Sequence, residues 1–409
     1  MRTQRCKGTR DLSPAEMAVF RLIEGVFRNA CLNWGYQEVR TPTLEYLHLF
    51  TSVGTLTPGM LGRVYSFLDW DGWSGERVVL RPDGTIPVAR LYIDSMEKEK
   101  LAKLFYVANT FIFEATGKKT RERWQCGAEL VGVSSPSADV ELVMLVLEVL
   151  KRLQIDGVKL KLSHAGLIRA LLARLGLSPD EQARVFDRIL DGDGKALAEL
   201  GLDSSELEML SALLGLKGKS STFVKSLKAL LAPDLAGLQP GIDDLASVAG
   251  LLEALGADYQ IELASVRGFE YYTGVIFQIF RGREKIGGGG RYDALIPLMG
   301  GRDVPASGVA LYLDRLMELV KLEALAEVKA PGILVRAKPE AAKEGFSLVA
   351  RLHEAGYKAE FNLGAQAASD FNWTLDVQSK TPKFILTSRA NKKKFEAETV
   401  KDILKLLKG

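Results

Sequence analysis

Hydrophobic residues recur at helical spacing over "PAEMAVFRLIEGVFRNACLNWGY", residues 14–36. This spacing predicts one long amphipathic helix, and Gly35 is a suitable residue for its C-cap. The next stretch, "QEVRTPTLEYLHLF" (residues 37–50), lacks the helical spacing and is interrupted by Pro42. Because proline has no N–H to give to a sheet ladder, we expect an extended segment at a sheet edge or strand end.

Strand-like patterns dominate the part of the chain that follows. "RVVLRPDGTIPVARLY" (77–92) and "LAKLFYVANTFIFEATGKKTRERWQCGAELVGV" (101–133) predict strands, turns and a hairpin with the polar loop "ATGKKTRER". Strand character returns in "YQIELASVRGFEYYTGVIFQIF" (259–280). The stretch "GGGGRYDALIPLMGG" (287–301) is expected to form a glycine-rich turn that leads into a helix or loop. These elements indicate an antiparallel sheet.

Two further changes of pattern divide the chain. From about residue 165 to about residue 255 the spacing is helical and is broken by Gly, Pro and Asp, which predicts a helical insertion. After residue 329 strand and helix signals alternate, as in "GILVRA", "EAAKEGFSLVARLHEAGY" and "KFILTS". We therefore expect a core of residues 1–329 that carries the insertion, and a small α/β domain of residues 330–409.

Composition indicates a folded protein without a dominant charge. Hydrophobic residues make up 47% and charged residues 26% of the 409 residues, and the net charge is +3, which does not by itself require a nucleic-acid partner. The basic run "RANKKKF" (389–395) is expected to be solvated surface. The three cysteines form no CxxC pair, and no apolar run is long enough to span a bilayer. We expect a cytoplasmic protein without a membrane partner, a metal or a cofactor.

Arg267 is the first candidate for a binding residue, because it stands in an apolar, strand-like segment. A buried guanidinium offers five donors and needs several acceptors, which an ion pair with a protein carboxylate or a carboxylate ligand supplies. Strict alternation along a strand puts Arg267, Phe269 and Tyr271 on one face and Tyr272 on the other.

Two pairs of polar residues suggest a pocket for an amino acid. Asp83 and Thr85 share a face if "LRPDGT" is extended, and suit an ammonium group. Gln125 and Glu129 share a face of a strand and suit an imidazole or an amine. Each pair is also compatible with a half-exposed strand whose polar side faces water.

Other kinds of site find little support in the sequence. Phosphate-binding, zinc-peptidase and nucleophile-elbow motifs are absent from the sequence. The histidines, His48, His164 and His353, are isolated in sequence and are expected to be structural.

In this order, the motifs resemble those of the histidyl-tRNA synthetases and of their paralogues, the regulatory subunits of ATP phosphoribosyltransferase. "TPTLE", "FIFEATGKKTRERWQCGAELVG" and "SGVALYLDRL" are similar to motifs 1, 2 and 3 of class II synthetases, and "RGFEYYTG" and "GGGGRYDAL" to the two histidine-specific motifs. The resemblance implies an α+β fold, a class II aminoacyl-tRNA synthetase-like antiparallel sheet flanked by helices. It also implies homodimers formed through the motif 1 region.

The resemblance assigns residues to two sites. Those that match family contacts to histidine are Asp83, Thr85, Gln125, Glu129, Arg267, Phe269, Tyr271, Tyr272 and Tyr292. Arg121 and Arg315 match arginines of the nucleotide side. Tyr272 is a pocket residue in the family, so a bulge is expected to change the alternation derived above.

Departures from the synthetase pattern favour the regulatory subunits. Ile112 stands where the synthetases carry the motif 2 arginine that holds the α-phosphate of ATP, and Tyr312 stands near a small glycine of motif 3. Losing such a donor costs factors of about 10² to 10³ in rate. The resemblance thus implies a non-catalytic subunit that binds the short-form catalytic subunit and senses L-histidine, without a tRNA partner. The alternatives are an active histidyl-tRNA synthetase and a synthetase-like protein that binds RNA or another partner.

Overall fold

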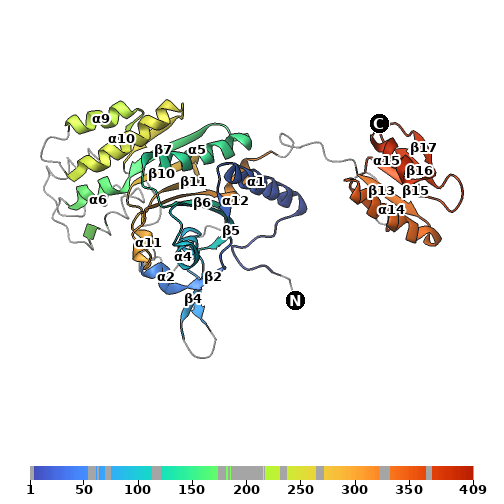
Figure 1. Ribbon diagram of the computed structural model, residues 1–409, viewed down its shortest axis with the longest axis horizontal. Coiled ribbons are helices and arrows are strands. Elements are labelled where there is room, and N and C mark those ends of the chain that lie inside the picture. Colours follow the sequence, from blue (N-terminus) through green and yellow to red (C-terminus); the bar gives the residue numbers. More distant parts are fainter. Residues whose placement is uncertain are drawn as a thin grey trace. The chain divides into compact units, whose positions relative to one another are not determined.

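In the computed structural model, the described residues of the chain are 4–53, 61, 64–69, 75–112, 121–173, 181–182, 185, 215, 217–230, 237–263, 271–321, 332–364 and 371–408. The chain divides into two compact units, Met1–Val320 and Lys321–Gly409. Figure 1 shows the helices and strands of both units.

A nine-stranded sheet forms the centre of the first unit, in the order β1-β5-β6-β12-β11-β10-β7-β9-β8. All neighbours are antiparallel except the pairs β1/β5 and β7/β9. The strands are β1 (Gln37–Glu38), β5 (Ala102–Phe111), β6 (Glu122–Val131), β7 (Val158–His164), β8 (Lys217–Gly218), β9 (Tyr259–Glu262), β10 (Val275–Arg281), β11 (Glu284–Arg291) and β12 (Ala306–Tyr312). The predicted hairpin of motif 2 is the pair β5/β6, and the mainly antiparallel character of the sheet is as expected.

Helices flank this sheet as predicted (Figure 1). Helix α1 (Pro14–Asn33) begins with a capping box in which Ser13 and Glu16 satisfy each other's backbone N–H groups, and Gly35 follows its end with φ +80°. Helices α1 and α5 (Pro136–Arg152) pack against each other and against strands β5, β6 and β12. Three short helices complete this part: α4 (Thr85–Leu91), α11 (Leu295–Leu298) and α12 (Leu313–Leu319).

A small three-stranded sheet, in the order β2-β4-β3, lies next to α2 (Leu47–Thr51). Its strands are β2 (Leu44–Tyr46), β3 (Ser66–Leu68) and β4 (Arg77–Leu80). The predicted extended segment of residues 37–50 is therefore only partly correct, because its last residues form α2. Large apolar side chains on β2 and β3 are exposed, by 40% to 47% of their surface: Leu44, Tyr46, Phe67 and Leu68.

The glycine-rich stretch Gly287–Gly290 is a strand rather than the expected turn. It is the middle of β11 and pairs with β10 on one side and β12 on the other. A Cβ atom on Gly289 would lie 2.0 Å from the carbonyl oxygen of Gly308 in β12. The lack of side chains thus permits a close approach between strands, which local sequence patterns do not reveal.

Only part of the predicted helical insertion is described. Its described helices are α6 (Ala165–Ala173), α9 (Ser221–Leu230) and α10 (Gln239–Ala254). Helix α10 packs against α5, α6, α9 and strand β7. The side chains of α10 that face this core are buried: Ile242, Leu245, Val248, Ala249 and Leu252.

The second unit is a five-stranded mixed sheet in the order β14-β13-β15-β16-β17. Its strands are β13 (Ile333–Ala337), β14 (Ala359–Phe361), β15 (Trp373–Val377), β16 (Phe384–Ser388) and β17 (Lys394–Ala397). The connection from β13 to the parallel strand β14 runs through a 3₁₀ turn (Pro339–Ala341) and α14 (Ala342–Glu354), and α15 (Val400–Lys408) follows β17. The alternating strand and helix signals of this region are confirmed.

Candidate functional site

A buried polar cluster occupies one face of the large sheet, and Glu129 of β6 is at its centre. The Glu129 carboxyl group is 2% exposed. It accepts hydrogen bonds from the hydroxyl groups of Thr85 at 2.8 Å, Tyr106 at 3.4 Å and Tyr292. These donors come from α4, from β5 and from the residue after β11, so the cluster unites segments far apart in the chain.

Asp83 enters the cluster from a helix N-terminus, not from the extended segment that we expected. Its Oδ1 accepts the backbone N–H groups of Thr85 and Ile86, the latter at 3.2 Å, and so caps the first turn of α4 from the position before the N-cap residue, Gly84. Its Oδ2 accepts the hydroxyl of Tyr271 at 3.3 Å. Asp83 and Thr85 still reach the same cluster, but the geometry that brings them together is a cap followed by a helical turn.

Gln125 and Glu129 share a face of β6, as their spacing predicts. The hydroxyl of Tyr106 lies between them, since it accepts from Gln125 Nε2 at 3.2 Å and donates to Glu129. Sequence reasoning missed Tyr106, which stands in an apolar strand. Its signal is indirect: Gly84 and Gly127 leave room for the phenol ring, because a Cβ on either would lie 2.2 to 2.3 Å from it.

Besides Tyr106, three tyrosines whose rings contact one another belong to the cluster. The ring of Tyr271 lies 5.3 Å from that of Tyr272 and 5.4 Å from that of Tyr292, between centroids. Strict alternation wrongly separated Tyr271 from Tyr272, and the expected bulge is not the reason. Both residues precede β10 and lie outside any strand, so that period-2 geometry does not apply to them.

Burial controls the charge of the two carboxyl groups. Loss of water raises the pKa of Glu129 to about 8, although hydrogen bonds from Tyr292 and Thr85 oppose the shift. Burial likewise raises the pKa of Asp83 to about 6, against the backbone N–H groups of Ile86 and Thr85. Among the described residues no cationic side chain forms an ion pair with either group. A cationic or proton-accepting ligand flanked by aromatic rings is the chemistry that fits this arrangement.

The remaining predicted residues stand apart from these contacts. Arg267 and Phe269 lie outside the described residues. The backbone N–H of Arg121 donates to Gly8 at 2.7 Å, and its side chain is half-buried. Arg315 lies at the surface, 3.4 Å from Glu318 and 4.0 Å from Glu284.

Neither a metal site nor a membrane-spanning helix occurs among the described residues. No cluster of His, Cys, Asp and Glu among them could hold a metal ion. None of the helices in the described part of the chain is long and apolar enough to cross a membrane.

Comparisons with known proteins identify relatives along nearly the whole chain. A profile of the family described as histidyl-tRNA synthetase matches residues 8–316. Proteins named ATP phosphoribosyltransferase regulatory subunit from three strains of Dehalococcoides mccartyi are 47–48% identical over 406 residues, 99% of this chain and 98% of each relative. A histidine–tRNA ligase of Methanosarcina acetivorans is 34% identical over 394 residues, 91% of this chain and 90% of the relative.

Solved structures agree with these relatives. A crystal structure of an ATP phosphoribosyltransferase regulatory subunit/histidyl-tRNA synthetase from Bacillus halodurans matches with a TM-score of 0.74 at 25% identity, over 90% of this chain and 94% of that one. A histidyl-tRNA synthetase from Nostoc sp. matches with a TM-score of 0.76 at 18% identity, over 100% and 99%, which shows the class II fold alone. The chain belongs to the histidyl-tRNA synthetase family in the broad sense and, within it, to the ATP phosphoribosyltransferase regulatory subunits.

Proposed function

We propose that this protein is a non-catalytic regulatory subunit that activates the short catalytic subunit of ATP phosphoribosyltransferase in the first step of histidine biosynthesis, and that makes this step sensitive to histidine. The observation that carries the proposal is a pocket for an amino acid in a chain whose motif 2 arginine position is occupied by the apolar Ile112. Ile112, at the position of the motif 2 arginine, follows β5 and is half-buried, and its N–H donates to the carbonyl of Arg121 at 3.0 Å. An apolar side chain cannot stabilise the negative charge that develops on ATP.

In this proposal the buried cluster is the histidine pocket. Glu129 and Gln125 face the imidazole, Asp83 and Thr85 hold the ammonium group, and Arg267 binds the carboxylate. The aromatic residues Phe269, Tyr271, Tyr272 and Tyr292 enclose the ligand. Buried carboxyl groups with raised pKa values support this assignment, because a basic ligand can accept their proton and then pair with the carboxylate as a cation.

Sensitivity to histidine follows from linkage. A ligand shifts an equilibrium between quaternary states only by its difference in affinity for them. A pocket that binds histidine without reacting with it is sufficient for this purpose.

The proposal includes a homodimer and a cytoplasmic location shared with the catalytic subunit. Exposed apolar side chains on β2 and β3 support a protein contact at the motif 1 region: Leu44, Tyr46, Phe67 and Leu68. We also propose a division into a core of residues 1–329, with its insertion at about 165–255, and a domain of residues 330–409.

The direct test is formation of phosphoribosyl-ATP by the short catalytic subunit of the same organism. We expect this protein to increase the rate, and histidine to reverse the increase. Arg267→Ala should leave the increase intact and abolish the response to histidine, whereas Arg283→Ala, at an exposed position between β10 and β11, should behave as the unaltered protein. A folded catalytic subunit that this protein does not activate would refute the proposal.

The alternative function is that of a histidyl-tRNA synthetase, which the 34% identity to the Methanosarcina acetivorans ligase along 91% of the chain favours. It predicts transfer of histidine to tRNA that depends on ATP. The regulatory function predicts that this transfer is absent even at high concentrations of the protein.

A further inference from the structure

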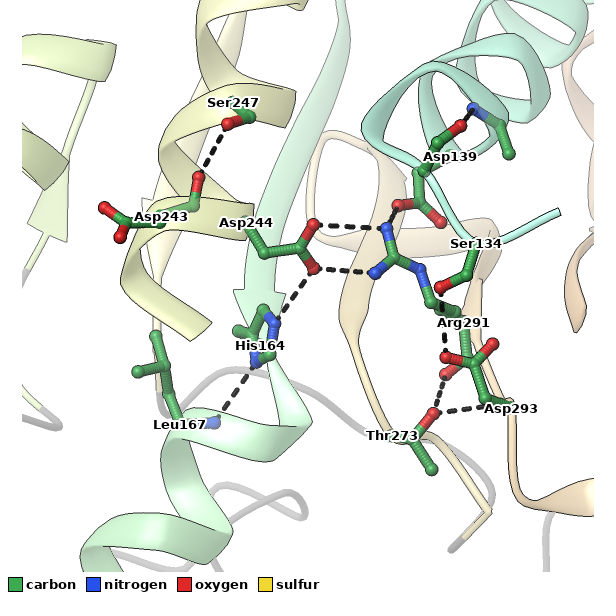
Figure 2. A network of polar contacts seen from close by, with 12 residues as sticks. Ser134, Asp139, His164, Leu167, Asp243, Asp244, Ser247, Thr273, Arg291 and Asp293 are labelled. Atoms are coloured by element: carbon green, nitrogen blue, oxygen red, sulfur yellow. Dashed lines mark hydrogen bonds and ion pairs between the residues drawn. The ribbon is translucent and has the colours of Figure 1, made fainter. Parts of the chain in front are cut away.

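A second polar network joins the helical insertion to the sheet beside the proposed pocket (Figure 2). At its centre is Arg291, the last residue of β11, whose side chain is 9% exposed. Its guanidinium group pairs with Asp139 of α5 and with both carboxylate oxygens of Asp244 of α10, at 2.9 and 3.3 Å. Asp244 Oδ2 is also 3.2 Å from Nε2 of His164, at the end of β7.

The pKa values of the two carboxyl groups around Arg291 are shifted in opposite directions. Burial raises the pKa of Asp139 to about 7, in spite of the attraction of Arg291. Burial acts in the same direction on Asp244, but the hydrogen bond with His164 and the charge of Arg291 outweigh it and lower the pKa of Asp244. Asp244 is therefore ionised, and its ion pair with Arg291 attaches β11 to the insertion.

His164 extends this attachment to a second helix of the insertion. The backbone N–H of Leu167 donates to His164 Nδ1 at 3.1 Å, so Nδ1 carries no proton and Nε2–H points to Asp244. Leu167 belongs to the first turn of α6. Gly241 of α10 lies close to the same imidazole, since a Cβ there would be 3.2 Å from Cε1 of His164. Asp244 thus fixes α10 and the start of α6 together.

The backbone of Arg291 adjoins two aromatic walls of the proposed pocket, Tyr292 and Tyr272. Tyr292, whose hydroxyl donates to Glu129, is the next residue in the chain. The carbonyl of Arg291 accepts the N–H of Thr273 at 2.8 Å, and Thr273 directly follows Tyr272. The backbone of Arg291 is therefore joined both to Tyr292 and to the segment that follows Tyr272.

The segment Thr273–Gly274 is enclosed between Arg291 and the insertion. A Cβ on Gly274 would lie 3.0 Å from Cδ of Arg291, and its carbonyl accepts the N–H of Ala165, the first residue of α6, at 2.8 Å. Close packing leaves such a segment few ways to move alone. The pocket, Arg291 and the insertion therefore form one contiguous set of contacts.

We propose that Arg291 and Asp244 couple occupancy of the histidine pocket to the order of the helical insertion. A bound ligand fixes Tyr292 and the segment after Tyr272, and Arg291, through Asp244, then holds α10 and the first turn of α6 more firmly. Arg291 is a positioning residue that does not touch the ligand. This inference rests on the proposed function, in which the pocket binds histidine.

Hydrogen–deuterium exchange of the unaltered protein tests the coupling without any substitution. With saturating histidine, we expect the exchange rates of the α10 amides to fall by a factor of about five or more. A factor of about five is the lower end of usual allosteric coupling strengths. Protection of β6 and β12 without any change in α10 would overturn the inference and leave the histidine pocket standing. If calorimetry shows no binding of histidine to the protein, the proposed function fails, and the inference fails with it.

Asp244→Asn tests the residue that we hold responsible. The variant should bind histidine but lose the added protection of α10, and the catalytic complex that contains it should lose its inhibition by histidine. Asp243→Asn is the matched control, because Asp243 is exposed on α10 and directed away from Arg291 (Figure 2), and it should behave as the unaltered protein. Asp244→Glu retains the charge and should restore part of the protection. If histidine protects α10 in Asp244→Asn as much as in the control, the role of Asp244 is refuted. If Asp244→Asn does not fold, hydrogen–deuterium exchange in the unaltered protein and in Asp244→Glu decides whether Asp244 couples the pocket to α10.

Discussion

Replacement of Glu129 by glutamine should change how the stability of the first unit depends on pH. The amide has the shape of the carboxyl group but does not ionise. In the folded protein, burial raises the pKa of Glu129 from the ordinary value of 4.5 to about 8, so the carboxyl group keeps its proton at neutral pH. Between these values unfolding releases the proton, so the free energy of unfolding falls as pH rises, and the loss is complete above about pH 8. Glu129→Gln removes this contribution.

The interval between the two pKa values of Glu129 sets the size of the effect on stability. One proton corresponds to about 1.4 kcal/mol per pH unit, so the interval between the two pKa values amounts to about 5 kcal/mol. From pH 5.5 to pH 7 the variant should gain about 2 kcal/mol relative to the unaltered protein. Rearranged hydrogen bonds to Thr85 and Tyr292 cost about 1 kcal/mol, but this cost does not depend on pH. The raised pKa values of Asp83 and Asp139 also make the free energy of unfolding fall with rising pH. Both residues are present in the variant and in the unaltered protein, so their contributions cancel in the comparison.

Urea unfolding at pH 5.5, 7 and 8.5, followed by circular dichroism, measures this difference. The chain has two compact units, so the change should appear in the transition of Met1–Val320 and not in that of Lys321–Gly409. Parallel pH profiles for the variant and the unaltered protein would refute the reasoning, because Glu129 would then be ionised and solvated in the folded state.

Other properties of the pocket can be tested in the same way. Calorimetric titration with histidine should give an affinity that is constant between about pH 6.5 and 8, because proton transfer from Glu129 to the imidazole leaves the number of bound protons unchanged. The affinity should fall about tenfold per pH unit above this range, and at least tenfold per unit below it, where protonation of Asp83 adds to that of the free imidazole. A steady rise across this range would contradict proton transfer. Gly308→Ala should abolish histidine binding and destabilise the first unit, because its Cβ would lie 1.7 Å from Oε2 of Glu129; retained affinity would show that the pocket is wider than described. Gly25→Ala, in the middle of α1 where nothing lies within 4 Å of the added Cβ, should instead stabilise the protein by about 1 kcal/mol in urea unfolding.

Features that depend on local periodicity could be predicted from the sequence. Helix α1 and its cap follow from apolar spacing and from the residues that flank it. The shared face of Gln125 and Glu129 follows from the period of a strand. These predictions hold because neighbouring residues determine both the element and the direction of its side chains.

Features that depend on contacts between distant segments could not be predicted in this way. The glycines of β11 have the composition of a turn, and only the flanking strands make them a strand. The sequence pattern predicts an extended segment at Asp83. Its actual role, capping the first turn of α4, depends on how the chain enters the helix, which the local pattern does not show. Arg291 meets Asp139 and Asp244 across 152 and 47 residues of sequence, so that no local pattern identified it.

The glycine strand β11 also limits how the pocket can be redesigned. At each of Gly287–Gly290 an added Cβ would approach a neighbouring backbone oxygen to between 2.0 and 2.9 Å, so no side chain of any chemistry fits there. A library intended to convert the proposed histidine pocket into a site for another amino acid should leave these four positions fixed. Diversity belongs instead at Gln125, Glu129 and Tyr272, where a change of side chain alters the pocket without separating the strands.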